Sequence, residues 1–245
     1  MTLISKIAAA LALLLGGALA YANGGTYPLD RFPEPRLTDA AALQAGAKAF
    51  LSYCTGCHGA SAMRYNRLRD LGTSDEEIRT LLPEGVKTGD PIRTAMDPEQ
   101  AKASFGARPP DLSVIARARA SEAGSGADWL YTYLRAYYRD ATRPSGWNNA
   151  LFPSVAMPHV LAGLQGARGA TFIDTRVVRD DNGKPAAMVR TIASFDENGV
   201  RSERTESVDH GAAHEGREIV LGKAQGGALD QAGYDDTIAN LVAFL

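Results

Sequence analysis

The chain holds two cysteines, Cys54 and Cys57, and His58 follows directly after the second. This C-x-x-C-H spacing is the attachment signature of a c-type haem. Each thiol can add to one vinyl group of the same porphyrin, and the adjacent histidine can reach the iron as its proximal ligand. Because the sequence has no other cysteine, both thiols are free for this purpose. The motif therefore predicts one covalently bound haem c.

Two other interpretations of the cysteine pair are weaker. A dithiol redox site requires a surrounding βαβ pattern, which the sequence lacks. A tetrahedral structural zinc ion needs two further ligands, and only His159, His210 and His214 are available besides His58. Neither alternative explains why a histidine stands directly beside the second cysteine.

The N-terminus has the three parts of a secretory signal peptide. Lys6 supplies the positive charge, Ile7–Leu15 is an apolar run, and Ala20–Ala22 forms an A-x-A cleavage site. We therefore expect a signal peptide over residues 1–22 and a haem domain over residues 23–245. Export agrees with the haem interpretation, because covalent haem attachment is a feature of the exported side of energy-coupling membranes.

Composition excludes few functions, but it is informative on two points. The formal net charge is −2, so nucleic acid is not an expected partner. The 25 glycines and 12 prolines indicate many loops. A small protein that encloses a porphyrin needs fewer apolar side chains of its own, because the ring supplies part of the core.

The sequence predicts four helices after an extended, proline-containing arm over 27–37. Thr38 or Asp39 can cap the first helix, and Ser74 with Glu77 forms a capping box for the second. Their expected ranges are 39–53, 74–82, 128–139 and 230–245. The region 171–204 is different, because Asn-Gly pairs at 182–183 and 198–199 lie between β-type runs and predict hairpins. We expect this region to be a β insertion on the surface.

A c-type haem with a histidine on one side needs an assignment for its sixth position. Met157 lies in a loop bracketed by Pro153 and Pro158, where an irregular backbone can place a side chain over a flat ring. A thioether is a soft, neutral ligand that raises the reduction potential. Met157 is therefore the favoured ligand, and His159 and Met96 are the alternatives.

Several longer motifs give the chain a resemblance to cytochrome c1, the haem subunit of the cytochrome bc1 complex. They are Cys54–His58 with the following Met63–Leu68, the P-P-D-L-S element in Arg108–Ser113 with Arg117–Arg119, the aromatic segment Trp129–Arg139, Ala156–Pro158, and Tyr234–Leu245. The resemblance spans nearly the whole chain after residue 22. It implies a mainly α fold, a helical domain of the class I cytochrome c type around one covalent haem, with the β-hairpin insertion added.

The resemblance also implies roles for individual residues. Cys54 and Cys57 would carry the haem, and His58 and Met157 would bind its iron. In addition, Pro109 and Pro110 would pack on the haem edge near the proximal side.

Two further residues are implied near the haem propionates. Arg119 would pair with a propionate, since a guanidinium can hold a carboxylate through two parallel hydrogen bonds. Trp129 stands where the family often has tyrosine, and it would pack or hydrogen-bond nearby.

The function that the resemblance implies is outer-sphere electron transfer at the periplasmic face of a bacterial inner membrane. Such a subunit takes electrons from the Rieske iron–sulfur protein, passes them to a cytochrome c and is bound to cytochrome b. The family also has a C-terminal membrane anchor. The sequence after residue 22 has no run of about 20 apolar residues. The chain is therefore either a truncated form, which we favour, or a soluble protein.

Two rival functions remain open from the sequence. One is another exported monohaem cytochrome that serves an oxidase or a dehydrogenase. The other is a haem enzyme or gas sensor with an open sixth position, which would bind carbon monoxide when reduced.

Overall fold

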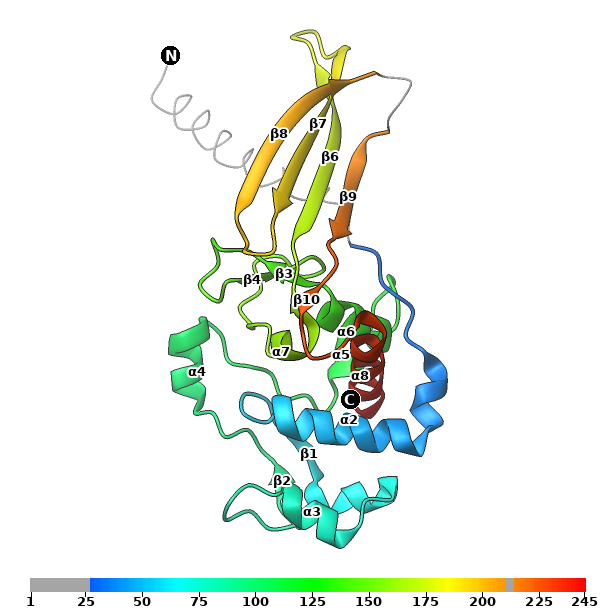
Figure 1. Cartoon of the computed structure of the whole chain (residues 1–245), viewed down its shortest axis with the longest axis vertical. Helices are drawn as coiled ribbons and strands as arrows, with labels where there is room; N and C mark the ends of the chain where they lie inside the picture. Colours follow the sequence, from blue (N-terminus) through cyan, green and yellow to red (C-terminus); the bar gives the residue numbers. More distant parts are fainter. Residues whose placement is uncertain (1–26, 210–213) are drawn as a thin grey trace, which may run out of the picture.

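The computed structural model describes residues 27–209 and 214–245. The predicted signal peptide, residues 1–22, lies outside these ranges. Of the described residues, 34% are helical and 25% are in strands. The expectation of a mainly α fold is therefore wrong. The strands come from several two-stranded pairs within the helical part and from one larger sheet that projects from it (Figure 1).

The helical part is built from short segments, most of them near the end of the molecule opposite the larger sheet (Figure 1). These segments are η1 Glu34–Thr38, α2 Ala40–Tyr53, η2 Tyr65–Leu71, α3 Asp75–Leu81, α4 Pro98–Phe105, α5 Ile115–Arg119, α6 Gly126–Arg135, α7 Ala162–Gln165 and α8 Gln231–Phe244. No helix within residues 27–209 and 214–245 has the length and apolar character needed to cross a bilayer.

Side-chain caps explain where the main helices begin. The Asp39 carboxylate accepts hydrogen bonds from the first turn of α2, as the sequence predicted. Ser74 and Glu77 form the predicted capping box at α3. Ser125 and Asp128 form a second capping box, which starts α6 at Gly126. That box has aspartate in place of the usual glutamate, and the sequence analysis missed it.

Two sequence expectations for the helical part need correction. The arm is not extended throughout, because residues 34–38 form the 3-10 helix η1. The helix expected over 128–139 ends at Arg135, and the next residues form strand β3, Tyr137–Arg139. Strand β3 pairs with β4, Trp147–Asn149, so a distant partner overrides the helical pattern there.

Two other short pairs close loops of the helical part. Strand β1, Ala60–Arg64, pairs with β2, Pro91–Ile92. Strand β5, Gly166–Ala167, pairs with β10, Gln225–Gly226. Each pair joins segments at least 25 residues apart, so none has the alternation and tight turn that make a hairpin recognisable from sequence.

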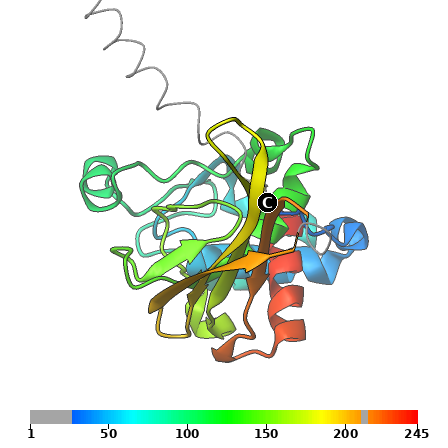
Figure 2. The same cartoon turned by 90° about the horizontal axis from the view of Figure 1, so that it is seen from above.

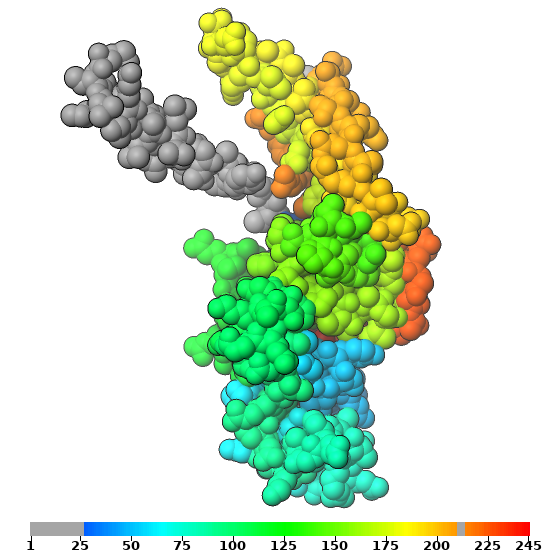
Figure 3. Space-filling model, turned by 90° about the vertical axis from the view of Figure 1, so that its left-hand side faces the viewer, coloured from blue at the N-terminus to red at the C-terminus, as the bar shows by residue number. Residues whose placement is uncertain are grey.

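The larger sheet, here called the β lobe, has the order β8-β7-β6-β9, and all its strands are antiparallel. The strands are β6 Ala170–Arg179, β7 Pro185–Phe195, β8 Arg201–Val208 and β9 Gly216–Leu221. The two Asn-Gly turns fall between strands as predicted. The region is longer than 171–204, because β9 pairs back onto β6. Figure 3 shows the β lobe extending away from the helical part, and Figure 2 looks along its strands.

The core of the helical part depends on close contact between α2 and α8. A Cβ atom on Gly46 would lie 2.0 Å from the backbone oxygen of Asn240, so only glycine permits this approach. Beside it, the rings of Phe50 and Phe244 lie 5.6 Å apart. Tyr234 is fully buried, and its hydroxyl donates to the carbonyl of Leu134. These contacts position the two helices that border the cavity described next.

Candidate haem site

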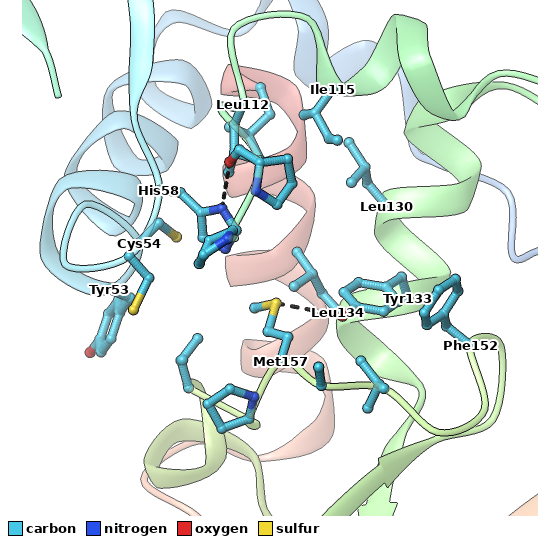
Figure 4. A pocket seen from close by; sticks show the side chains of 18 of the residues that line it. Tyr53, Cys54, His58, Leu112, Ile115, Leu130, Tyr133, Leu134, Phe152 and Met157 are labelled. Atoms are coloured by element: carbon cyan, nitrogen blue, oxygen red, sulfur yellow. Dashed lines mark hydrogen bonds between the residues drawn. The ribbon is translucent and has the colours of Figure 1, made fainter. Parts of the chain in front are cut away.

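An apolar cavity of about 290 Å³ lies between the end of α2, helix α6, the last residues of the chain and two loops (Figure 4). The loops are residues 105–112 and 152–161. Most of the lining is aliphatic or aromatic, with Leu130, Leu134 and Leu241 on the helix side. All eight residues predicted at the site line this cavity: Cys54, Cys57, His58, Pro109, Pro110, Arg119, Trp129 and Met157.

Helix α2 delivers the C-x-x-C-H motif to the cavity. Cys54 is the C-cap of α2, and His58 then turns back so that its backbone N–H donates to the carbonyl of Cys54. Both cysteines are free thiols. Burial, followed by the nearby thiol of Cys57, raises the pKa of Cys54 to about 12. Both thiols therefore line the same cavity as His58, with no disulfide between them.

The ring of His58 has one nitrogen occupied and one available. Its Nδ1 lies 2.7 Å from the carbonyl oxygen of Pro110. A carbonyl oxygen can only accept, so Nδ1 carries the proton and donates it. The other nitrogen, Nε2, is then unprotonated and can bind a metal. Pro110 thus contributes through its backbone as well as through its ring, a role that the sequence did not indicate.

Asp111 holds the loop that carries Pro110, and the sequence analysis did not select it for this role. Its Oδ2 accepts from the backbone N–H of Ser61, 50 residues away, and its Oδ1 accepts from Ser113. Burial alone would raise the pKa of Asp111, but these hydrogen bonds outweigh it and lower the pKa to about 2. The charged carboxylate therefore fixes the P-P-D-L-S element against the segment that follows His58.

Met157 projects into the cavity on the side opposite His58 (Figure 4), and two tyrosines contact it. The Tyr133 hydroxyl lies 3.5 Å from the Met157 sulfur, and the Tyr137 hydroxyl lies 3.2 Å from the Met157 carbonyl oxygen. Burial is the main cause that raises the pKa of both phenols. Both tyrosines belong to the segment 128–139 for which the sequence predicted a helix, but Tyr137 lies in strand β3.

The two alternative sixth ligands do not line the cavity. His159 is buried behind it, where its ring stacks on Tyr137 and its Nε2 lies 2.7 Å from Oε1 of Gln165. Burial lowers the pKa of His159 to about 4, so the ring is neutral at neutral pH. Met96 is in the loop before α4.

Arg119 and Trp129 lie together at one side of the cavity. The guanidinium carbon of Arg119 is 4.4 Å from the centre of the Trp129 ring, and Trp129 in turn stacks on Tyr133 at 4.8 Å. Arg119 has no carboxylate within ion-pair distance among residues 27–209 and 214–245. A cation at an apolar cavity without an acidic partner is suited to an anionic group of a ligand.

The residues present fit a covalently attached haem. An apolar cavity holds two free thiols, a histidine with an available Nε2, a thioether and an unpaired guanidinium. Zinc fits less well, since the described part of the chain has no cluster of three or more His, Cys, Asp or Glu side chains that could hold a metal. His210 lies outside that part.

One family model and several known proteins are similar in sequence to this chain. The model of the Cytochrome C1 family matches residues 85–168. A protein of Allochromatium vinosum named cytochrome c1 is 47% identical over 167 residues, which cover 67% of this chain and 66% of the relative. Cytochrome c1 of Rhodospirillum rubrum is 32% identical over 180 residues, covering 60% of this chain and 62% of the relative.

Another relative has a different name. A protein of Nitrosomonas europaea called ammonia monooxygenase gamma subunit is 52% identical over 157 residues, covering 64% of each chain. The chain thus spans just under two thirds of the length of these relatives.

Proposed function

The chain belongs to the cytochrome c1 family, and on that premise we propose that it is the haem-bearing electron-transfer subunit of a cytochrome bc1 complex. Members of the family carry one covalently bound haem c. The observation that carries the proposal is the cavity that unites the Cys54–His58 motif, Met157 and Arg119. In this proposal the chain acts by positioning one redox centre, and none of its residues needs to act as an acid, base or nucleophile.

When bound, haem c supplies an iron that changes between two oxidation states and so carries one electron. Cys54 and Cys57 would hold the porphyrin by thioether bonds, and His58 would bind the iron through Nε2. The hydrogen bond from His58 to Pro110 keeps the imidazole in the required tautomer and orientation.

Met157 would supply its thioether sulfur as the other protein ligand of the iron. It is a weaker donor than imidazole and therefore favours the reduced state. The apolar lining excludes water, and this raises the potential further because the charge of the oxidised state is poorly solvated. Arg119 pairs with a propionate at the edge of the cavity.

The partners belong to the same proposal. Electrons arrive from a Rieske iron–sulfur protein and leave to a soluble or tethered cytochrome c, and the chain is bound to cytochrome b at the periplasmic face of the inner membrane. Quinol is oxidised elsewhere in such a complex, so the isolated chain does not oxidise it. An exported monohaem cytochrome that serves an oxidase or a dehydrogenase is the alternative.

The first experiment compares optical spectra and midpoint potentials of Met157→Leu and of Met96→Leu, the matched control outside the cavity. Both variants keep the α band of covalent haem. Met157→Leu loses the charge-transfer band from sulfur to ferric iron, and its potential falls by a large margin. Met96→Leu keeps both the charge-transfer band and the midpoint potential of the wild-type protein. Retention of the band and of the potential in Met157→Leu would exclude Met157 as the ligand.

A second experiment addresses the complex. The chain is isolated with a mild detergent from native membranes, and the proteins that elute with it are identified. We expect cytochrome b and a Rieske protein in constant ratio to it. Elution with oxidase or dehydrogenase subunits instead would favour the alternative.

A further inference from the structure

Two buried tyrosines and Met157 form three short polar contacts. The Tyr133 hydroxyl lies 3.5 Å from the Met157 sulfur, the Tyr137 hydroxyl lies 3.2 Å from the Met157 carbonyl oxygen, and the two hydroxyls are 2.8 Å apart. Tyr133 is 8% exposed and Tyr137 is 1% exposed. All three contacts are thus made in a place where bulk water does not compete.

The two tyrosines have too few hydroxyl protons to make all three contacts as hydrogen bonds at the same time. A phenol has one hydroxyl proton, so two tyrosines can make only two of the three hydrogen bonds at once. Two oxygens 2.8 Å apart require a proton between them. If Tyr137 donates to Tyr133, then Tyr133 donates to the sulfur. If Tyr133 donates to Tyr137, then Tyr137 donates to the carbonyl oxygen, and the sulfur has no donor.

Resting on the proposed role of Met157 as an iron ligand, we propose that this pair is a hydrogen-bond switch controlled by the redox state. The two hydroxyls point toward the Met157 sulfur in the reduced protein and toward the Met157 carbonyl in the oxidised protein. The sulfur is the better acceptor when the iron it binds is ferrous, because a ferric ion withdraws electron density from it. The extra positive charge also repels the proton of the Tyr133 hydroxyl.

The surroundings allow the hydroxyls to reorient while the rings stay in place. Tyr133 stacks on Trp129 with ring centres 4.8 Å apart, and Tyr137 stacks on His159 with ring centres 4.6 Å apart. Only rotation about two C–O bonds is required. Both protons remain on the phenols, so the switch takes up and releases no proton when the electron arrives.

The proposal predicts that two conservative variants shift the midpoint potential in opposite directions. Tyr133→Phe removes the donor to the sulfur, so the reduced state loses stabilisation and the midpoint potential falls. Tyr137→Phe removes the competing acceptor, so Tyr133 donates to the sulfur in both states and the potential rises. Each change alters the ratio of oxidised to reduced protein at fixed potential by about two- to tenfold, the range of one net hydrogen bond.

Tyr131→Phe is the matched control. Tyr131 is on the same helix, but its ring packs against Phe32 and it does not line the cavity. We expect the midpoint potential of Tyr131→Phe to equal that of the wild-type protein. Shifts of equal sign in Tyr133→Phe and Tyr137→Phe, or no shift in either, would overturn the switch.

A second measurement does not depend on the variants folding. Met157-Pro158 is the one Met-Pro pair in the sequence, so ¹³C at the methionine carbonyl combined with ¹⁵N in proline marks a single peptide bond. In the infrared difference spectrum, this carbonyl band moves to higher frequency on reduction, because the carbonyl loses its donor. A band at the same frequency in both states would contradict the proposal.

The outcome can be separated from that of the proposed function. If the wild-type protein lacks the charge-transfer band from sulfur to ferric iron, Met157 is not the ligand and the premise fails. If that band is present and the potentials do not shift in opposite directions, only the switch is refuted.

Discussion

The haem cavity and the β lobe are held together in opposite ways. Around the cavity, polar groups far apart in sequence meet, as when Arg135 pairs with Asp235, 100 residues away. In the β lobe, β6, β7 and β8 pair through tight turns with their neighbours in the chain, and every residue of β8 except Val208 is exposed. The cavity therefore depends on the whole helical part, whereas the lobe depends mainly on local pairing.

The two regions meet over a small aromatic contact. Tyr138 packs against Phe172 and Phe195, with ring centres 5.4 Å and 5.2 Å away. Beyond it, the lobe has one layer, and no second sheet or helix from residues 27–209 and 214–245 covers a face. A change far out in the lobe consequently has few contacts through which to reach the cavity.

The largest expected difference between the regions concerns glycine. A Cβ atom on Gly126 would lie 1.5 Å from the carbonyl oxygen of Ala116, so Gly126→Ala must push α5 and α6 apart. We expect a loss of about 4 kcal/mol or more in the free energy of unfolding, or failure to fold. Gly183→Ala is the counterpart in the lobe, where the turn has open space and φ is +78°. We expect Gly183→Ala to lower the free energy of unfolding by about 1 kcal/mol.

Denaturant unfolding of the haem-loaded protein measures both glycine variants. The haem absorption band reports the helical part, and far-ultraviolet circular dichroism reports the lobe as well. If the two signals change over the same range of denaturant in both variants, the lobe and the helical part unfold as one unit.

The next largest effect compares two arginines with the same geometry. Arg135 holds Asp235 through two hydrogen bonds of 2.6 and 3.1 Å, and Arg217 holds Asp174 through two of 2.8 and 2.9 Å. Their side chains are 18% and 38% exposed. Arg135→Ala removes both hydrogen bonds from the Asp235 carboxylate, which is 25% exposed, and costs about 2 kcal/mol. Arg217→Ala costs below about 1 kcal/mol.

The two ion pairs, Arg135–Asp235 and Arg217–Asp174, should also differ in how strongly salt weakens them. Raising the ionic strength to about 1 M, where the Debye length is about 3 Å, should remove most of the effect of Arg217→Ala and little of the effect of Arg135→Ala. A salt-sensitive loss in Arg135→Ala would show that its pair is solvated like the one in the lobe.

The smallest expected effect is the pH dependence from Asp111. Its pKa is about 2 in the folded protein against an ordinary 3.8, so its contribution to stability is complete above pH 3.8 and is lost as the pH falls through about 2. The carboxyl is largely exposed, and solvent screening limits the cost of Asp111→Asn to about 0.5 kcal/mol. The variant and the wild-type protein should differ in unfolding free energy at neutral pH and converge near pH 2.

Local signals in the sequence predicted some elements well. The caps at Asp39 and Ser74 gave the starts of α2 and α3, and the Asn-Gly turns gave the lobe hairpins. The fold class failed for a physical reason, because strands such as β5 and β10 form only by pairing across a long distance and have no pattern of their own. Strand β9 was missed for the same reason, since it returns to β6 without a tight turn.

The residues of the site also differ in whether the sequence alone could identify them. Cys54, Cys57 and His58 form a contiguous motif, so the sequence alone identifies them. The contacts of Tyr133, Tyr137 and Asp111 depend on segments 20 to 50 residues away, and no spacing rule brings those segments together. A motif can thus identify the atoms that hold a cofactor, but it cannot identify the neighbours that adjust them.

The backbone contact at Gly46 has a mechanical consequence. Because α2 and α8 touch at Gly46 without a side chain between them, no compliant layer separates the two backbones at that point. A force applied along α8 is transmitted to α2 and from its end to Cys54, with little loss in side-chain rearrangement. The two helices therefore move as one rigid unit, and the contacts of α8 set the orientation of the Cys54–His58 motif.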